Sequence, residues 1–430
     1  MSATRITRGA YPADATPRSA TGVSFTGILP RRYTLLLETQ IPLAQPDIGP
    51  LEEAEVLEAL RSRQLGLGPK MGEFERLLAT FTGAPWARAV SSGTAGLHLA
   101  VRTLGIGEGD CVPMSSFSFI SSANAVRYEH AEPVFLDIEE PSLCLSPAAL
   151  RAYLETCDTD DDGTTFDATT HLRVAAVITT DVFGHPVDMD GILGAIGNRK
   201  IAVISDSCEA LGSRSRRGDG VMHHAGHGAD LTVFAFYPNK QITTGEGGMV
   251  TGTNATLCAE IESLRNQGRA AGDPWLRHTQ VGFNYRLDDL SAALGVAQMR
   301  RIDEILGNRA RVAGWYRERL ADLAPAVRTP VAAGSTEPAW FVEFLRVDPG
   351  VRQPMIEALL ADGVQAKAYF DIPIHRQPPY DGRPGCVPGP LPVTEDAAAS
   401  VVVIPFFSTM SEDQVAVVSD AVHRAIGAAA

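Results

Sequence analysis

Between residues 111 and 251 the sequence alternates strand-like apolar runs with helix-like stretches. The strand-like runs span residues 111–114, 133–138, 174–179, 201–205, 231–236 and 248–251. Helix-like stretches at residues 95–104, 147–154, 189–196 and 257–266 separate several of them. Near-continuous apolar strands are typical of a sheet that is buried on both faces. The alternation therefore predicts an α/β fold with a mostly parallel central sheet covered by helices on both faces.

The segments on either side of this alternation predict how the chain divides. Residues 51–63 have the apolar spacing of a helix, residues 287–323 form a long helical region, and the pattern changes after Pro325. A chain of 430 residues is long enough for one large and one smaller domain. We expect a disordered N-terminal extension over residues 1–40, a large domain over residues 41–323 whose first helix joins the small domain, and a small α+β domain over residues 324–430.

Composition excludes several classes of function. The net charge of −14 argues against a nucleic-acid partner, which needs a positive surface. No apolar run approaches the ~18 residues of a membrane helix. The six cysteines lack CxxC spacing, which indicates reduced thiols and a cytoplasmic protein. His223, His224 and His227 lie in a Gly-rich stretch without a Cys or carboxylate at useful spacing, so we predict no metal site.

Lys240 follows an apolar strand-like run and precedes Gly245, Gly247 and Gly248. An isolated lysine of this kind is most often an exposed loop residue. Two other features favour a catalytic role for Lys240. Asp206 ends the buried run 201–206, and a Ser-Ser-Gly-Thr turn precedes a helix. An amine that condenses with an aldehyde, a carboxylate at a strand end and a phosphate-binding turn are the groups that pyridoxal 5′-phosphate (PLP) requires.

Each of these residues also has an ordinary structural interpretation. Gly93 and Thr94 suit a phosphate, because small residues at a helix N-terminus expose N–H groups and partial positive charge, but Ser92 or Thr94 can simply cap the helix. Asp206 lies where open α/β sheets bind ligands, or is a capping residue. Phe119 can stack on a pyridine ring or pack in the core.

Taken together, these motifs resemble those of the DegT/DnrJ/EryC1/StrS aminotransferases, which are PLP-dependent sugar aminotransferases of fold type I. The resemblance runs from about Ile41 to the C-terminus. It is carried by the motifs at residues 91–100 (SSGTAGLHLA), 121–126 (SSANAV), 206–212 (DSCEALG), 264–269 (LRNQGR) and 282–288 (GFNYRLD), together with the run around Lys240.

The resemblance implies catalytic and ring-binding roles for four residues. Lys240 would condense with the cofactor aldehyde and later carry the proton between cofactor and substrate carbons. Asp206 would pair with the pyridine nitrogen, and Glu209 would occupy the position of a family Gln or Glu near the ring hydroxyl. Phe119 matches the stacking aromatic residue.

The resemblance also implies how the phosphate and the substrate are bound. Gly93 and Thr94 match the phosphate-binding turn, and Asn284 matches an asparagine that reaches the phosphate of the neighbouring subunit's cofactor. The working unit would therefore be a homodimer with shared active sites. Arg286 and His375 fall where relatives contact substrate.

Three positions depart from the family pattern. Ala235 stands where many relatives have a serine that helps to hold the phosphate, so one hydrogen bond would be missing, at a cost of about 1 kcal/mol. Ser115 stands where Pro is common, and Asp181 where His is common. We expect the last two to lie near the active-site wall and to mark an unusual substrate.

The resemblance implies transamination of a keto-sugar, specifically a nucleotide-linked 4-keto-6-deoxysugar, with L-glutamate as the amino donor. Such an enzyme would serve amino sugar biosynthesis, for an antibiotic or an O-antigen. Three alternatives remain: an aminotransferase of a cyclitol ketone, a PLP-dependent sugar 3-dehydratase, and a non-catalytic regulator that keeps the fold. The dehydratase would have His in place of Lys240, so the lysine argues against it.

Overall fold

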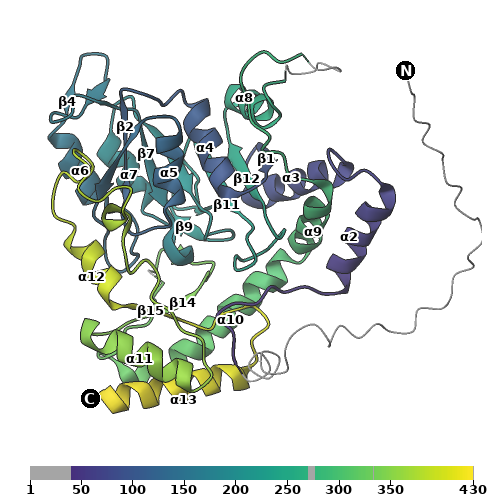
Figure 1. The fold of residues 1–430 in the computed structure, drawn as a ribbon, viewed down its shortest axis with the longest axis vertical. Helices are drawn as coiled ribbons and strands as arrows, with labels where there is room; N and C mark the ends of the chain where they lie inside the picture. Colours follow the sequence, from purple (N-terminus) through teal and green to yellow (C-terminus); the bar gives the residue numbers. More distant parts are fainter. Residues whose placement is uncertain (1–39, 270–276, 333, 430) are drawn as a thin grey trace, which may run out of the picture. The chain divides into compact units, whose positions relative to one another are not determined.

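A ten-stranded sheet carries most of the strands that the sequence predicts (Figure 1). The structure, a computed structural model, describes residues 40–269, 277–332 and 334–429. The strands are β1 (Trp86–Val90), β2 (Asp110–Ser115), β3 (Glu132–Leu136), β4 (Asp158–Thr159), β5 (Thr165–Phe166), β6 (Arg173–Val174), β7 (Ala176–Thr180), β8 (Ala202–Asp206), β11 (Leu231–Ala235) and β12 (Gly248–Gly252). The predicted extension, residues 1–40, lies outside the described residues except for Gln40.

The centre of this sheet is parallel. Strands β3, β2, β7, β8 and β11 pair in parallel in that order, and β6 also pairs in parallel with β2. At one edge β12 and β1 are antiparallel, and at the other β5 and β4 are. The sheet is therefore mixed but mostly parallel, as predicted. Residues 236–247 contain no helix to carry the chain across the sheet, so β12 returns as an antiparallel neighbour of β11.

Helices cover both faces of the sheet, which confirms the predicted architecture. Side chains of β7 alternate between two apolar cores: Ala176 and Ile178 join one, and Val177 joins the other. The first core is shared with helices α4 (Gly93–Thr103), α5 (Ser121–Tyr128) and α8 (Ala255–Arg265), and the second with α6 (Pro147–Glu155) and α7 (Met189–Ile196). Figure 1 shows α4 and α5 as neighbours on their face of the sheet.

Helix α2 (Pro50–Ser62) packs against α9 (Asp289–Arg300), as does α3 (Pro69–Thr82). The buried side chains Glu52 and Glu55 of α2 pair with Arg301 and Arg300 around the end of α9. Charge pairs at the end of α9, together with the buried Ala59, therefore hold α2 in place. That this first helix joins the small domain stays a prediction.

The C-terminal segment forms its own apolar core around a two-stranded sheet. It contains α10 (Ile302–Arg319), β14 (Glu343–Arg346), α11 (Pro349–Ala361), α12 (Pro392–Ser400), β15 (Val401–Ile404) and α13 (Glu412–Ala429). Val312 and Tyr316 of α10 are buried in this core. The helical region predicted at residues 287–323 is interrupted at Arg301, which ends α9 and begins α10. The division into domains at residue 323 stays a prediction.

Short elements connect these layers. A small sheet has the order β10-β9-β13. Its strands and the remaining short helices are η1 (Val182–Gly184), β9 (Arg214–Arg216), β10 (Met222–His224), η2 (Ala321–Leu323), β13 (Thr336–Glu337) and η3 (Ile374–Arg376). Among the described helices, none has both the length and the apolar character required to cross a bilayer. All six cysteines fall within the described residues and are free thiols.

Candidate active site

A pocket of about 610 Å³ lies where the central strands end and α4 begins. Thr180, Asp206 and Ala235, at or beside the carboxyl ends of β7, β8 and β11, line it. This is the edge at which open parallel sheets bind ligands. The pocket brings together six residues that the sequence nominated: Gly93, Thr94, Phe119, Asp206, Glu209 and Lys240.

Asp206 is the last residue of β8 and is 4% exposed. Strand alternation points its side chain to the face that carries α4 and α5. There the Ser122 hydroxyl donates a hydrogen bond to Oδ2 at 2.6 Å, and the Cys208 N–H donates one to Oδ1 at 3.2 Å. These two bonds fix the carboxylate at the pocket wall, which a capping role alone does not require.

Lys240 lies beyond the end of β11, in a turn in which its N–H donates to the Tyr237 carbonyl. Its Nζ donates to Oε1 of Glu209 at 3.2 Å and lies 4.0 Å from the ring centroid of Phe341. The Phe183 N–H donates to the other oxygen of Glu209 at 2.9 Å. The amine is therefore held by a buried carboxylate and an aromatic face, unlike the amine of an exposed loop lysine.

The N-terminus of α4 forms another part of the pocket lining. The Ser92 hydroxyl accepts the Ala95 N–H at 3.1 Å, so the capping interpretation is also correct. The N–H groups of Gly93 and Thr94 belong to the first helical turn, where no carbonyl of the helix can accept them. A Cβ on Gly93 would lie 2.7 Å from the Cβ of Ala235, so glycine is needed where α4 meets β11.

Phe119 is 63% exposed at the pocket, whereas its neighbour Phe117 is fully buried. Phe119 is therefore available to a ligand and does not pack in the core. A hydroxyl for the ligand is also present, because Thr94 and Ser121 line the same pocket as Ala235, where the family serine is missing.

The described lining of the pocket does not include Asn284, Arg286 or His375. Asn284 is exposed, and Arg286 donates to Oδ1 of Asn266 at 3.0 Å. His375 is 5% exposed, with Nδ1 2.7 Å from the Ser116 hydroxyl. His375 therefore does not line this pocket, because its ring is buried against Ser116, and its role in substrate binding stays a prediction.

Several lining residues were missed by sequence reasoning. The aromatic wall consists of Phe341, Tyr369 and Phe370, which come from the C-terminal segment. The ring of Phe370 stacks on that of Phe183 with centroids 5.4 Å apart, and burial raises the pKa of the Tyr369 phenol. No local pattern near Lys240 signals residues a hundred or more positions away. The remaining lining residues that were missed are Ser92, Ser118, Ser121, Thr180, Cys208, Tyr237, Asn239, Glu246 and Gly247.

The two other departures from the family pattern do not line the pocket. Ser115 is 1% exposed, and its hydroxyl has no hydrogen-bond partner among the described residues. Asp181 is 1% exposed and accepts hydrogen bonds from the Ser207 hydroxyl and the Val187 N–H. Both residues therefore lie behind the active-site wall and do not line it, and Asp181 contacts the wall through the Asp206 carbonyl. That they mark an unusual substrate stays a prediction.

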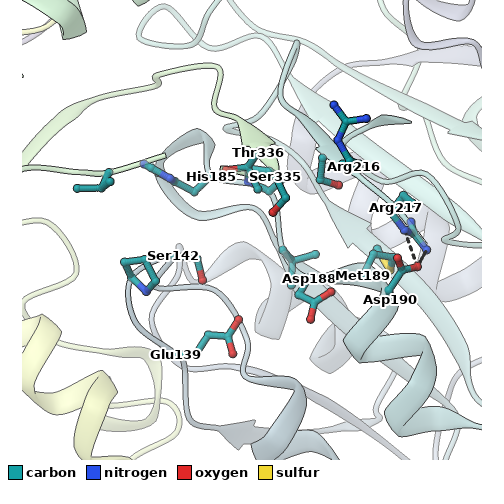
Figure 2. A pocket seen from close by; sticks show the side chains of 15 residues that line it. Glu139, Ser142, His185, Asp188, Met189, Asp190, Arg216, Arg217, Ser335 and Thr336 are labelled. Atoms are coloured by element: carbon teal, nitrogen blue, oxygen red, sulfur yellow. Dashed lines mark hydrogen bonds and ion pairs between the residues drawn. The ribbon is translucent and has the colours of Figure 1, made fainter. Parts of the chain in front are cut away.

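A second pocket of about 250 Å³ lies between the N-terminus of α7 and the small sheet (Figure 2). Figure 2 shows Arg217 paired with Asp190 on one side and Glu139 on the other. None of the site residues nominated from the sequence lines this pocket. Within the part of the chain that the structure describes, no group of three or more His, Cys, Asp or Glu side chains is placed to hold a metal ion.

The first pocket has the chemistry that PLP requires. It offers an amine, a carboxylate fixed by two donors, an exposed aromatic ring and free N–H groups at a helix N-terminus. A Cβ on Gly248 would lie 2.7 Å from the Ser92 backbone, so two glycines keep this turn against β11 and β12. The residues present therefore fit the cofactor.

Comparisons with known proteins identify the family of the chain. The model of the DegT/DnrJ/EryC1/StrS aminotransferase family matches residues 46–423. The chain is 35% identical over 347 residues to GDP-perosamine synthase of Caulobacter vibrioides, covering 79% of this chain and 87% of that protein. It is 31% identical over 383 residues to the putative pyridoxal phosphate-dependent aminotransferase EpsN of Bacillus subtilis, covering 88% and 94%. The crystal structure of the aminotransferase TlmJ from Streptoalloteichus hindustanus matches with a TM-score of 0.80 at 27% identity, covering 90% and 99%. The predicted family and fold type are confirmed.

Proposed function

The chain belongs to the DegT/DnrJ/EryC1/StrS aminotransferase family, and from this premise we propose that it transfers the amino group of L-glutamate to a nucleotide-linked 4-keto-6-deoxysugar. That it is a PLP-dependent sugar aminotransferase follows from the family. The observation that carries the site assignment is the convergence of Lys240, Asp206 and the α4 N-terminus on one pocket.

Bound PLP supplies an aldehyde for condensation with amines and a ring that accepts the electrons of a broken C–H bond. The Lys240 amine would hold the cofactor through its aldehyde and would be the group that carries a proton between cofactor and substrate carbons. Asp206 would hold the pyridine nitrogen and keep it protonated. The Ser122 hydroxyl and the Cys208 N–H prevent the carboxylate from turning away.

Glu209 holds the amine of Lys240 between turnovers, because its Oε1 accepts from Nζ while the Phe183 N–H fixes its Oε2. Gly93 and Thr94 bind the phosphate through N–H groups at the positive end of α4. Phe119, exposed at the pocket, would hold the ring by stacking.

The substrate class is supported by the first relative above, whose name specifies a GDP-linked sugar. Arg286 contacts the substrate only if the dimer brings it there, because it does not line the pocket of its own chain. A cyclitol ketone is the main alternative substrate. The lysine at position 240 and the intact carboxylate of Asp206 argue against the dehydratase and the regulator.

We assign the working unit as a homodimer in which Asn284 reaches the phosphate of the partner's cofactor. Asn284 is exposed, and Val281 nearby is 79% exposed, so this segment is available to a second copy. The other partners are the small-molecule donor and acceptor, and neither nucleic acid nor a membrane takes part. We place the enzyme in the cytoplasm, in amino sugar biosynthesis for an antibiotic or a cell-surface polysaccharide.

The test is the visible spectrum of the purified protein with PLP, before and after L-glutamate. We expect a band near ~420 nm that is replaced by one near ~330 nm as the cofactor takes up the amino group. The enzyme whose cofactor has taken up the amino group is then mixed, in parallel, with nucleotide-linked 4-keto-6-deoxysugars and with cyclitol ketones. A bound-cofactor band that no amino donor changes would contradict transamination, and absence of any band would favour the regulator.

A further inference from the structure

Asp181, the residue after β7, lies behind Asp206 and is 1% exposed. Its Oδ2 accepts a hydrogen bond from the Ser207 hydroxyl at 2.6 Å, and the Ser205 hydroxyl lies 3.5 Å from the same oxygen. Its own N–H donates to the carbonyl of Asp206 at 3.1 Å. Asp181 therefore contacts the residue before Asp206, the residue after it, and the main chain of Asp206 itself.

The alternation of β8 explains this arrangement. Ile204 faces the core beside α4 and α5, and Val203 faces the core on the other side. Asp206 follows the direction of Ile204, so Ser205 and Ser207 point away from the cofactor pocket. On that side Asp181 accepts hydrogen bonds from their hydroxyls, and so fixes the end of β8 without a hydrogen bond to the carboxylate of Asp206.

The second oxygen of Asp181 holds the loop whose residue Phe183 binds Glu209. The Val187 N–H donates to Oδ1 at 2.8 Å and so closes the segment 181–187, which contains η1. Within that segment Phe183 has φ 56° and ψ 19°, a left-handed conformation that a bulky residue adopts only under constraint from its surroundings. The Phe183 N–H is the group that holds Oε2 of Glu209. The far end of the same loop, at His185 and Asp188, lines the second pocket (Figure 2).

We propose that Asp181 is a positioning residue for the reaction: one buried carboxylate fixes the end of β8 and the Phe183 loop, and so places both Asp206 and Glu209 around the cofactor ring. The inference rests on the roles proposed above for these two residues. It assigns a function to a carboxylate that does not line the pocket.

The groups around Asp181 are hydrogen-bond donors, so this position requires a residue with an acceptor. An N–H and two hydroxyl groups converge on it, and two of these donors bind different oxygens. Asparagine keeps a carbonyl oxygen for the Val187 N–H, and its amide can donate to the Ser207 hydroxyl. Alanine leaves the buried Val187 N–H without a partner, which is costly.

The experiment compares Asp181→Ala and Asp181→Asn in the full chain, with Asp167→Ala as the matched control. Asp167 is also buried and accepts hydrogen bonds from the Thr170 N–H and hydroxyl and from the Tyr153 hydroxyl, far from the pocket. PLP affinity is measured by titration of the apoenzyme, urea unfolding is followed on the same samples, and kcat and KM for the amino donor are measured separately.

We expect Asp181→Ala to raise the Kd for PLP by roughly 10- to 100-fold, as the loss of one or two buried hydrogen bonds predicts. Its kcat should fall while KM for the donor changes little. Asp181→Asn should stay within about threefold of the parent in Kd, since it keeps the acceptor. Asp167→Ala should lose stability but keep the affinity for PLP.

Wild-type PLP affinity in Asp181→Ala would overturn the proposal, as would an equal loss of affinity in Asp167→Ala. If Asp181→Ala does not fold, Ser207→Ala replaces it, and wild-type affinity in that variant would be decisive against the proposal. The variant Asp206→Asn tests the proposed role of Asp206 separately from that of Asp181. If that variant leaves the cofactor spectrum unchanged, the role of Asp206 itself fails, whatever Asp181 does.

Discussion

The amine of Lys240 and the carboxylate of Glu209 form a partly buried ion pair, with Nζ 3.2 Å from Oε1 and side chains 13% and 11% exposed. Removing one member of such a pair leaves the other charge without a partner away from water, which costs more than an exposed pair contributes. The pair holds the amine at the pocket before the cofactor arrives.

Replacing Lys240 with Ala should remove the bound-cofactor band near ~420 nm and lower kcat by at least about a hundredfold, because the amine and the proton carrier are lost together. Circular dichroism should show an intact fold. Lys200→Ala is the matched control, since that lysine is exposed. Transamination at the parental rate in Lys240→Ala would contradict the assignment.

Replacing Glu209 with Ala should lower the free energy of unfolding of the apoenzyme by about 1–3 kcal/mol, because the buried Phe183 N–H and the Lys240 amine both lose their acceptor. Glu209→Gln keeps one acceptor oxygen and should lose less. Urea denaturation measures both. Equal stability of Glu209→Ala and the parent would show that water replaces the carboxylate.

Replacing Gly93 with Ala should weaken PLP binding by at least about tenfold and destabilise the fold by about 1–3 kcal/mol. The new Cβ would lie 2.7 Å from the Cβ of Ala235 and 3.0 Å from Sγ of Cys208, so α4 must shift from β11. Gly72→Ala is the control: its Cβ meets only the Arg76 guanidinium at 3.6 Å, and the change should stabilise α3 by about 0.5–1 kcal/mol. If Gly93→Ala binds PLP as tightly as the parent does, the assignment of the phosphate site to this turn is contradicted.

The stability of the apoenzyme should carry two opposite pH dependences between about pH 4 and 6. Burial raises the pKa of Asp181 from 3.8 to about 6, so the folded state holds a proton that the unfolded chain releases, and this contribution falls as pH rises. Burial lowers the pKa of His185 from 6.5 to about 4, so the unfolded chain binds the extra proton, and this contribution rises with pH.

Asp181→Asn should therefore make stability rise more steeply with pH in this window, by up to about 1.4 kcal/mol per pH unit, and His185→Gln should have the opposite effect. Urea unfolding at several values between pH 4 and 6 gives both slopes. If the parent and Asp181→Asn give parallel curves of stability against pH, the pKa of Asp181 is the same in the folded and the unfolded chain.

Mixing inactive Lys240→Ala with inactive Asn284→Ala should restore activity if Asn284 serves the partner's site. A mixed dimer then contains one site with both an intact lysine and an intact asparagine. The activity should appear at the rate of subunit exchange, and neither variant alone should gain it. A mixture that stays inactive while exchange is demonstrated would place Asn284 outside the shared site.

The central strands were predictable because their signal is local. The run 201–205 is apolar up to Ser205, and it became β8 (Ala202–Asp206) within one residue of the expected bounds. The first strand, β1 (Trp86–Val90), was missed because Arg88 interrupts its short apolar pattern. The antiparallel return of β12 was also missed, since the strand pattern does not record direction.

The sequence by itself determined the fold class, the family and the pocket residues Lys240, Asp206 and Gly93, because each depends on a pattern of adjacent residues: an apolar run, a strand end, a turn before a helix. Only the tertiary structure decided which distant groups surround them. It brought Phe341 over the amine, buried His375 against Ser116 and placed Asp181 behind Asp206. Such contacts depend on how the C-terminal segment and the end of β7 pack on the sheet, and no spacing along the chain encodes that packing.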